Sequence, residues 1–136
     1  MLTSCYPVLC TADVVRSSRF WTTWFDFTTT FEADWYVSLE RRVGDRSFEL
    51  GLVAADHSTV PAGYRTPARG LLVNMEVDDV DAQWRRLVVD GKLEPALSLR
   101  TEDFGQRHFI VPGPDGVLVD VITNVPASAE YSALYR

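Results

Sequence analysis

An acidic side chain stands within one of the most apolar segments of this sequence. Asp120 lies in the run 117–122, whose other members are valine, leucine and isoleucine, and such a run is typical of a strand buried on at least one face. An ionised carboxylate is costly there unless a partner charge, a metal ion, water or a ligand accompanies it. Asp120 is therefore the first candidate for a functional residue, and its partner is the central question.

A second acid, Glu49, lies in a similar strand-like segment at 47–53. Two carboxylates in one half-buried site would raise the pKa of at least one of them, which suits acid–base catalysis or the recognition of an amine. A structural ion pair with Arg107 or another arginine is an equally good interpretation from the residues alone.

Other side chains are candidates for ligand contact. Trp35, Tyr36 and Phe104 could stack on a flat aromatic ligand. His108 could act as a general base, but no nucleophile or metal set accompanies it, so we interpret it as a residue that hydrogen-bonds across a pocket or an interface. Arg107 could clamp an anionic group.

These residues lie on elements that occur in the order βαβββ twice, which predicts an α+β fold. The first series has a strand at 6–10, a helix at 13–25 that Asp13 can cap, and strands at 28–32, 35–41 and 47–53. The second has a strand at 71–77, a helix that Asp79 begins and Gly91 ends, and strands at 94–99, 106–111 and 116–123. We assign a single domain, 1–136, made of a first unit at 4–53, a connecting loop at 54–69, a second unit at 70–123 and a C-terminal tail at 124–136.

Alternation along the strands separates an apolar face from a more polar one, because successive side chains point to opposite sides. The apolar faces suit packing under the two helices. The opposite faces carry Tyr6, Glu49, Leu72, Asn74 and Asp120. We interpret these five residues as facing a ligand-binding surface.

Composition limits the classes of function. A net charge of −6 argues against nucleic-acid binding, which depends on basic surface. No apolar run approaches the roughly 20 residues of a membrane span, and the first residues lack a leader pattern, so we expect a cytoplasmic protein. Cys5 and Cys10 cannot bridge within one extended strand, and we interpret both as thiols in a reducing compartment.

The chain resembles the vicinal oxygen chelate superfamily, which includes glyoxalase I, extradiol dioxygenases, and fosfomycin- and bleomycin-resistance proteins. The resemblance extends from Tyr6 to about Thr123. Its supporting segments are residues 12–14, 20–21 and 24–27, where Asp26 replaces the usual glycine, and Pro114-Asp115-Gly116 before the acidic strand. The resemblance implies two βαβββ units that form curved mixed sheets around a concave pocket.

Metal-binding members of that superfamily take ligands from the first and last strands of each unit. The matching positions here are Tyr6, Glu49, Leu72 and Asp120. Both histidine ligands are missing, and a leucine cannot ligate, whereas a divalent ion needs three or four suitable protein ligands. We therefore expect no cofactor, and should a divalent metal be present, Glu49, His108 and Asp120 are the fallback ligands.

The resemblance is closest to the metal-free, antibiotic-binding resistance branch, which shares an aromatic-Gly-(Gln/Arg) segment before the seventh strand, here residues 104–107. It implies a non-catalytic bacterial homodimer that sequesters a planar aromatic or cationic antibiotic in a cleft at the dimer interface. The alternatives are a glyoxalase-like metal-dependent lyase, isomerase or dioxygenase with an irregular ligand set, and a metal-free enzyme with His108 or Glu49 as base. Ligand contact is assigned to Tyr6, Trp35, Tyr36, Glu49, Leu72, Asn74, Phe104, Arg107, His108 and Asp120.

Overall fold

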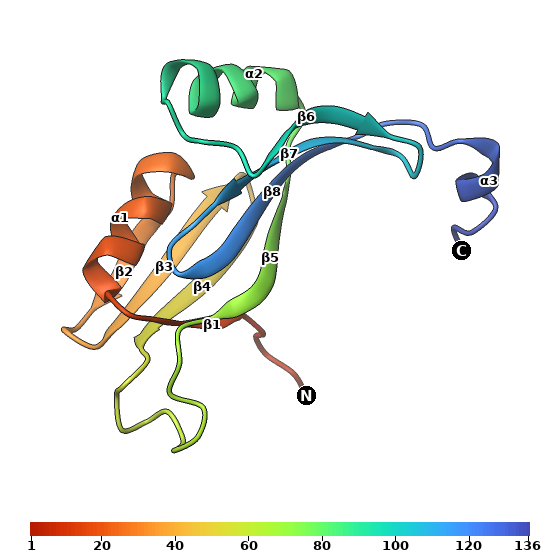
Figure 1. The fold of residues 1–136 in the computed structure, drawn as a ribbon. Helices are drawn as coiled ribbons and strands as arrows, with labels where there is room; N and C mark the ends of the chain where they lie inside the picture. The colour runs from red at the N-terminus through yellow and green to blue at the C-terminus, as the bar shows by residue number, and fades with distance from the viewer. The chain divides into compact units, whose positions relative to one another are not determined.

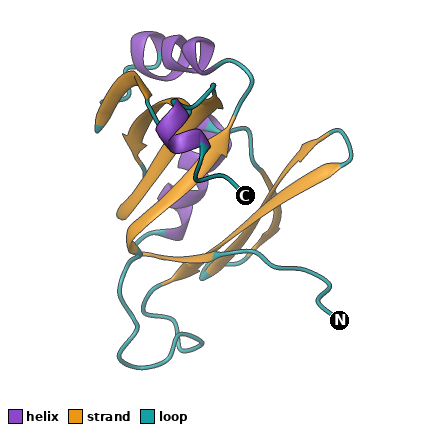
Figure 2. Cartoon of the chain, turned by 90° about the vertical axis from the view of Figure 1, so that its right-hand side faces the viewer, coloured by secondary structure: helices purple, strands orange, loops and turns teal.

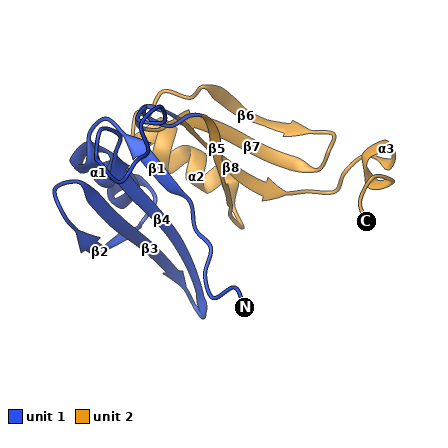
Figure 3. Ribbon diagram, turned by 90° about the horizontal axis from the view of Figure 1, so that it is seen from below, with its two compact units in different colours: residues 1–69, 114–116 blue, residues 70–113, 117–136 orange.

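The computed structural model describes residues 1–136 and contains two four-stranded mixed sheets with a few helices (Figure 1). The chain divides into two compact units, residues 1–69 with 114–116 and residues 70–113 with 117–136 (Figure 3). The predicted α+β class and the repeated order βαβββ are confirmed. None of the helices has the length and apolar character that a membrane span requires.

The first unit is built on one mixed sheet. Its strands are β1 (Val8–Thr11), β2 (Thr28–Glu32), β3 (Tyr36–Val43) and β4 (Arg46–Ala54), in the order β1-β4-β3-β2. β1 runs parallel to β4, whereas β3 is antiparallel to both β4 and β2. The tight turn between β3 and β4 places Gly44 at a φ of 58°, a conformation that glycine adopts without steric cost.

Helix α1 (Val14–Trp24) packs on one face of this sheet (Figure 1). It begins as predicted, because the Asp13 side chain accepts a hydrogen bond from the Arg16 amide at 3.0 Å. Trp21, which is 1% exposed, packs its ring against Phe25 and Phe27 and centres the core of this unit. After the helix, Asp26 takes a φ of 57°, so an aspartate occupies the left-handed position where the superfamily usually has glycine.

The second unit repeats the arrangement. Its strands are β5 (Arg69–Glu76), β6 (Leu97–Glu102), β7 (Gln106–Pro112) and β8 (Gly116–Asn124), in the order β5-β8-β7-β6. β6 lies three residues later than the predicted strand at 94–99, and that prediction was wrong in its bounds. Pro95 has no amide hydrogen and cannot donate a hydrogen bond to β7. Just before β6, the Ala96 amide donates to the carbonyl of Ile110 in β7 at 2.8 Å.

Helix α2 (Val80–Trp84) packs on β7 and continues as a π-helical segment, η1 (Arg85–Asp90). Asp79 caps its start by accepting from the Ala82 amide at 2.9 Å, and Gly91 ends it, as the sequence predicts. The left-handed residue, however, is Lys92 with a φ of 60°, one position after the glycine. Trp84 meets Phe109 edge to face, with 5.2 Å between ring centroids, and joins the helix to the sheet.

The C-terminal tail follows β8 and contains a short helix, α3 (Ala129–Ser132), close to the end of the chain (Figure 2). The Val125 amide donates to the Gly105 carbonyl at 2.9 Å, and the Ser128 amide donates to the Asp103 carbonyl at 2.9 Å. These bonds fasten the tail to the turn between β6 and β7. Gly105 has a φ of 104°, and a Cβ there would lie 3.0 Å from the carbonyl oxygen of Val125.

Candidate functional site

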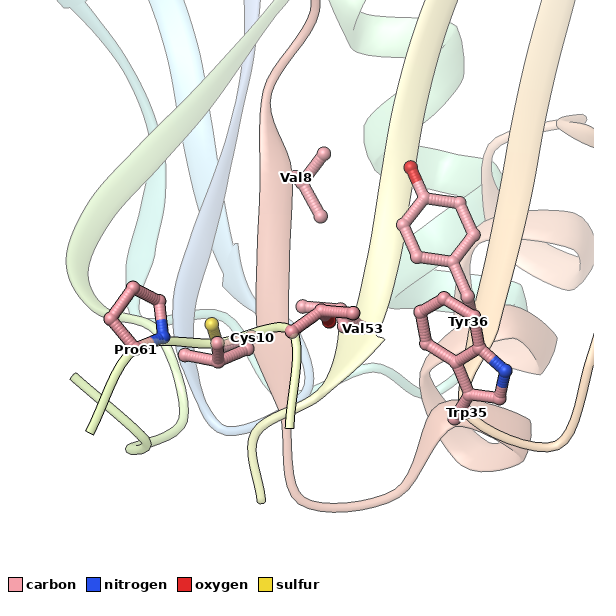
Figure 4. Close-up of a pocket in the computed structure, with 8 residues that line it drawn as sticks. Val8, Cys10, Trp35, Tyr36, Val53 and Pro61 are labelled. Atoms are coloured by element: carbon pink, nitrogen blue, oxygen red, sulfur yellow. The ribbon is translucent and has the colours of Figure 1, made fainter. Parts of the chain in front are cut away.

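An open pocket of about 490 Å³ lies on the sheet of the first unit (Figure 4). None of the side chains that line the pocket belongs to a charged residue type. The lining residues are Val8, Cys10, Trp35, Tyr36, Val53, Thr59, Val60 and Pro61. A pocket of this size is within the usual range for small-molecule sites, about 300–1,000 Å³.

The strand register explains why these side chains meet. Cys10 and Tyr36 both pair with Val53, so the three side chains lie side by side across β1, β4 and β3. Their strand neighbours point the opposite way, toward α1, and are buried; these are Leu9, Val37 and Leu52. The pocket therefore lies on the face of the sheet that the helix does not cover.

The loop after β4 supplies a second wall. Its Val60 amide donates to the His57 carbonyl at 3.0 Å, and the Arg65 guanidinium donates to the Val60 carbonyl at 2.8 Å. Trp35, just before β3, stacks on His57, with 3.9 Å between ring centroids and 8° between the ring planes. The stack joins the loop to the sheet and fixes the orientation of the indole.

Tyr36 lies over a glycine. A side chain at position 51 would overlap the Tyr36 hydroxyl and press on Val8, so Gly51 makes room for the tyrosine ring. Burial, and after it the proximity of Tyr6, raises the pKa of Tyr36 above its ordinary value. The phenol is therefore a neutral hydrogen-bonding group across the physiological pH range.

The first acid lies elsewhere on this sheet. Glu49 is exposed, pairs in register with Glu40 of β3, and accepts a hydrogen bond from the Ser4 hydroxyl at 3.4 Å. Tyr6 is also exposed and lies beside Tyr36. Neither Glu49 nor Tyr6 lines the pocket.

The second acid has an imidazole as its partner. Asp120 Oδ1 lies 2.8 Å from His108 Nδ1, and His108 Nε2 lies 3.2 Å from Glu102 Oε1. Arg100 in turn bonds to the same oxygen of Glu102. Both His108 and Asp120 are only 6% exposed. The second unit thus holds a continuous chain of four charged or ionisable side chains, which we call the His108 chain: Arg100, Glu102, His108 and Asp120.

The electrostatics of the His108 chain differ at its two acids. Burial raises the pKa of Asp120, and the hydrogen bond to His108 opposes this shift. Hydrogen bonds from His108 and Arg100 lower the pKa of Glu102. Because an ionised carboxylate only accepts hydrogen bonds, His108 must donate from both ring nitrogens when both acids are ionised.

The remaining sequence-assigned residues of the second unit are Phe104, Arg107, Leu72 and Asn74. Arg107 forms a bidentate ion pair with Asp81, at 2.8 and 3.0 Å, and holds α2 to β7. Phe104 meets the His108 ring edge to face, with 6.3 Å between centroids. Leu72 and Asn74 are exposed on β5. Ligand contact at each of these residues stays a prediction.

The donor set does not fit a metal ion. No cluster of three or more His, Cys, Asp or Glu side chains is arranged to hold one. In the fallback set, His108 has both ring nitrogens engaged and Asp120 is bound to it. Leu72, at one of the superfamily's ligand positions, has no donor atom.

Sequence reasoning missed two parts of this arrangement. Glu102 carried a usable signal, because the short turn at 103–105 pairs it with Gln106 and so places it diagonally from His108. The pocket wall formed by Thr59, Val60 and Pro61 carried no such signal, because an irregular loop shows no periodicity from which its fold could be predicted.

The comparison with protein families agrees with this geometry. The model of the Glyoxalase/Bleomycin resistance protein/Dioxygenase superfamily matches residues 5–121. The fold, two four-stranded mixed sheets each following the order βαβββ, is that of the superfamily. The chain belongs to the glyoxalase/bleomycin resistance protein/dioxygenase superfamily.

Solved structures share the fold at low sequence identity. A glyoxalase/bleomycin resistance protein/dioxygenase from Nocardioides is 22% identical, with a TM-score of 0.73 over 92% of this chain and 85% of that one. A lactoylglutathione lyase from Agrobacterium tumefaciens is 17% identical, with a TM-score of 0.69 over 90% of this chain and 95% of that one. A superfamily member from Sphaerobacter thermophilus is 13% identical, with a TM-score of 0.70 over 90% and 98%. No curated protein sequence matches the chain.

Proposed function

We propose that this protein binds a small molecule without a metal and without transforming it, as an antibiotic-sequestering member of its superfamily. The observation that carries the proposal is the pair formed by His108 and Asp120, at 2.8 Å. Asp120 occupies the last of the superfamily's ligand positions, and this pair holds it in a buried contact with another side chain of the same chain. With Leu72 at another of these positions, two of the four are unsuited to a metal.

The uncharged pocket of the first unit supports binding. It offers aromatic and aliphatic side chains and three neutral polar groups, which suits retention of an organic molecule. We further propose that the protein acts as a cytoplasmic homodimer, because members of the superfamily often form dimers.

The rival function is an enzyme that uses His108 as a general base. The Nδ1 atom of His108 bonds to Asp120 as in a catalytic dyad, but its Nε2 atom bonds to Glu102, and the residue is nearly buried. A general base must reach the proton it removes. This geometry favours a structural role for the histidine, and it favours binding over catalysis.

The experiment that tests the proposal has two parts. Protein purified without chelators is analysed for metals, and its thermal unfolding is then screened against a panel of antibiotics. We expect less than about a tenth of an equivalent of any transition metal, because the donor set falls short of three ligands. We also expect a compound that raises the melting temperature and is recovered unchanged by mass spectrometry. Near-stoichiometric metal, or chemical conversion of the compound, would overturn the proposal.

A further inference from the structure

We infer that the pocket of the first unit selects a flat, uncharged ring compound and disfavours a cation. The inference rests on the proposed binding function and adds the chemical class of the ligand. The sequence left open whether the ligand is planar and aromatic or cationic, and the pocket distinguishes between these two classes.

The lack of charged side chains in the pocket lining disfavours a cationic ligand. None of the eight lining residues is ionised near neutral pH, and the raised pKa of Tyr36 keeps its phenol neutral. No acid belongs to the lining, and two acids of this sheet have partners elsewhere: Glu40 bonds to Ser47 and Arg42, and Glu49 accepts from Ser4. A charged group that enters an apolar site without a partner loses hydration that nothing replaces.

The shape of the pocket favours a flat ring. Trp35 and Tyr36 stand on one side of the pocket and Pro61 on the other, with Val8 and Val53 between them (Figure 4). The indole is held in place by its stack on His57, whose Nδ1 atom lies 2.9 Å from the Thr59 hydroxyl. Because Trp35 is fixed before any ligand arrives, a stacking partner loses little binding free energy to ordering the wall.

Three neutral polar groups complete the recognition. The Tyr36 and Thr59 hydroxyls and the Cys10 thiol belong to the lining and can each exchange a hydrogen bond with an uncharged oxygen or nitrogen of the ligand. A ring compound with one or two such atoms fits this set. Cys10 also gives an experimental reporter, because it is a free thiol in the pocket, whereas Cys5 is a free exposed thiol outside it.

The test uses three probes that share one ring system and differ in charge: naphthylmethanol, naphthylmethylammonium and naphthoate. Binding to the purified chain is measured by equilibrium dialysis. We expect naphthylmethanol to bind at least about tenfold more tightly than either ion, because each ion would lose hydration in an uncharged pocket. Saturation with naphthylmethanol should slow the alkylation of Cys10 by iodoacetamide severalfold and leave Cys5 unaffected, as read by mass spectrometry.

Variants locate the site. Trp35→Ala should weaken naphthylmethanol binding by about tenfold or more, whereas Tyr64→Ala, an exposed aromatic in the same loop and outside the lining, should leave it unchanged. Should Trp35→Ala fold poorly, Thr59→Asp is the second variant, because position 59 is exposed. It adds a negative charge to the rim and should reverse the order of the neutral and ammonium probes.

Several results would overturn the inference. They are no binding of naphthylmethanol, equal or tighter binding of the ammonium probe to the wild type, or binding that persists in Trp35→Ala or keeps its order in Thr59→Asp. A Cys10 thiol that becomes more reactive on dilution would show that a second copy covers the pocket, which also overturns it. Bound transition metal would instead contradict the proposed function, so the two failures are distinguishable.

Discussion

His108 Nδ1 and Asp120 Oδ1 lie 2.8 Å apart across neighbouring strands β7 and β8, and both residues are almost fully buried. The register pairs His108 with Ile122 and Ile110 with Asp120, so the histidine and the acid are diagonal neighbours on one face of the sheet. This contact gives a partner to the one carboxylate that the apolar strand could not otherwise accommodate. It also leads to the first two predictions.

Replacement of His108 should destabilise the protein more than replacement of Asp120 by its amide. His108→Ala leaves the buried Asp120 carboxyl without its hydrogen-bond partner, and an unsatisfied buried polar group typically costs about 1–3 kcal/mol, more when it is charged. Asp120→Asn retains an acceptor for the imidazole and should cost about 1 kcal/mol. Urea unfolding followed by tryptophan fluorescence measures both. An equal loss in the two variants would contradict a buried acid that depends on His108 as its hydrogen-bond partner.

The pH dependence of stability should reveal the two acids of the His108 chain separately. The pKa of Asp120 is raised in the folded protein, so its contribution to stability is present below the unfolded pKa and is lost as the pH rises through the folded one. The pKa of Glu102 is lowered, so its contribution is present above the unfolded pKa and is lost as the pH falls.

These opposite shifts are tested by measuring the free energy of unfolding of two variants between about pH 3 and 7, a range that contains the ordinary pKa of both acids. As the pH rises, Asp120→Asn should gain stability relative to the wild type, because the variant lacks the unfavourable ionisation. Glu102→Gln should lose stability relative to the wild type over the same range. Differences of the same sign in both variants would show that the two carboxyls do not have opposite shifts.

Asp26 should tolerate glycine better than alanine. At a φ of 57° an L-residue with a Cβ is strained, although aspartate is strained less than most. Asp26→Ala should therefore cost about 1 kcal/mol, whereas Asp26→Gly should be as stable as the wild type or slightly more so. The ion pair with Arg41 at 3.8 Å is exposed and contributes little to either value. Thermal unfolding ranks the three proteins, and an alanine variant as stable as the glycine one would argue against the left-handed conformation.

Gly105→Ala should loosen the C-terminal tail. The new Cβ would meet the Val125 carbonyl and Ala127, and the backbone is in a conformation that only glycine adopts readily, so we expect a loss of about 2 kcal/mol. Hydrogen exchange at the Val125 and Ser128 amides should accelerate. Gly44→Ala is the control, since its φ is also positive but its Cβ would meet nothing. It should lower stability without accelerating exchange in the tail.

Gly51→Ala should change the pocket through Tyr36. The added methyl overlaps the tyrosine hydroxyl, so the ring must move, and naphthylmethanol binding should weaken severalfold. In a Tyr36→Ala background the overlap with the tyrosine is removed and only the close approach to Val8 remains, so the second substitution should have a smaller further effect. Dialysis of the two single variants and the double variant gives the coupling. Additive effects would show that position 51 acts on the pocket by another route.

The sequence by itself determined the architecture of this protein and the identity of its unusual residues. Short-range patterns carry that information: the period of apolar residues, the caps at Asp13 and Asp79, and the turn at 113–116 each depend on residues only a few positions apart. The acid in the final strand was also visible as an exception to its apolar neighbours.

Only the tertiary structure decided what those residues contact. The partner of Asp120 depends on the register between β7 and β8, which pairs His108 with Ile122 and Ile110 with Asp120. The pocket joins strand residues to Thr59, Val60 and Pro61, whose path is fixed by the stack of Trp35 on His57. Contacts between segments distant in sequence follow from packing of the whole chain, and no local pattern specifies them.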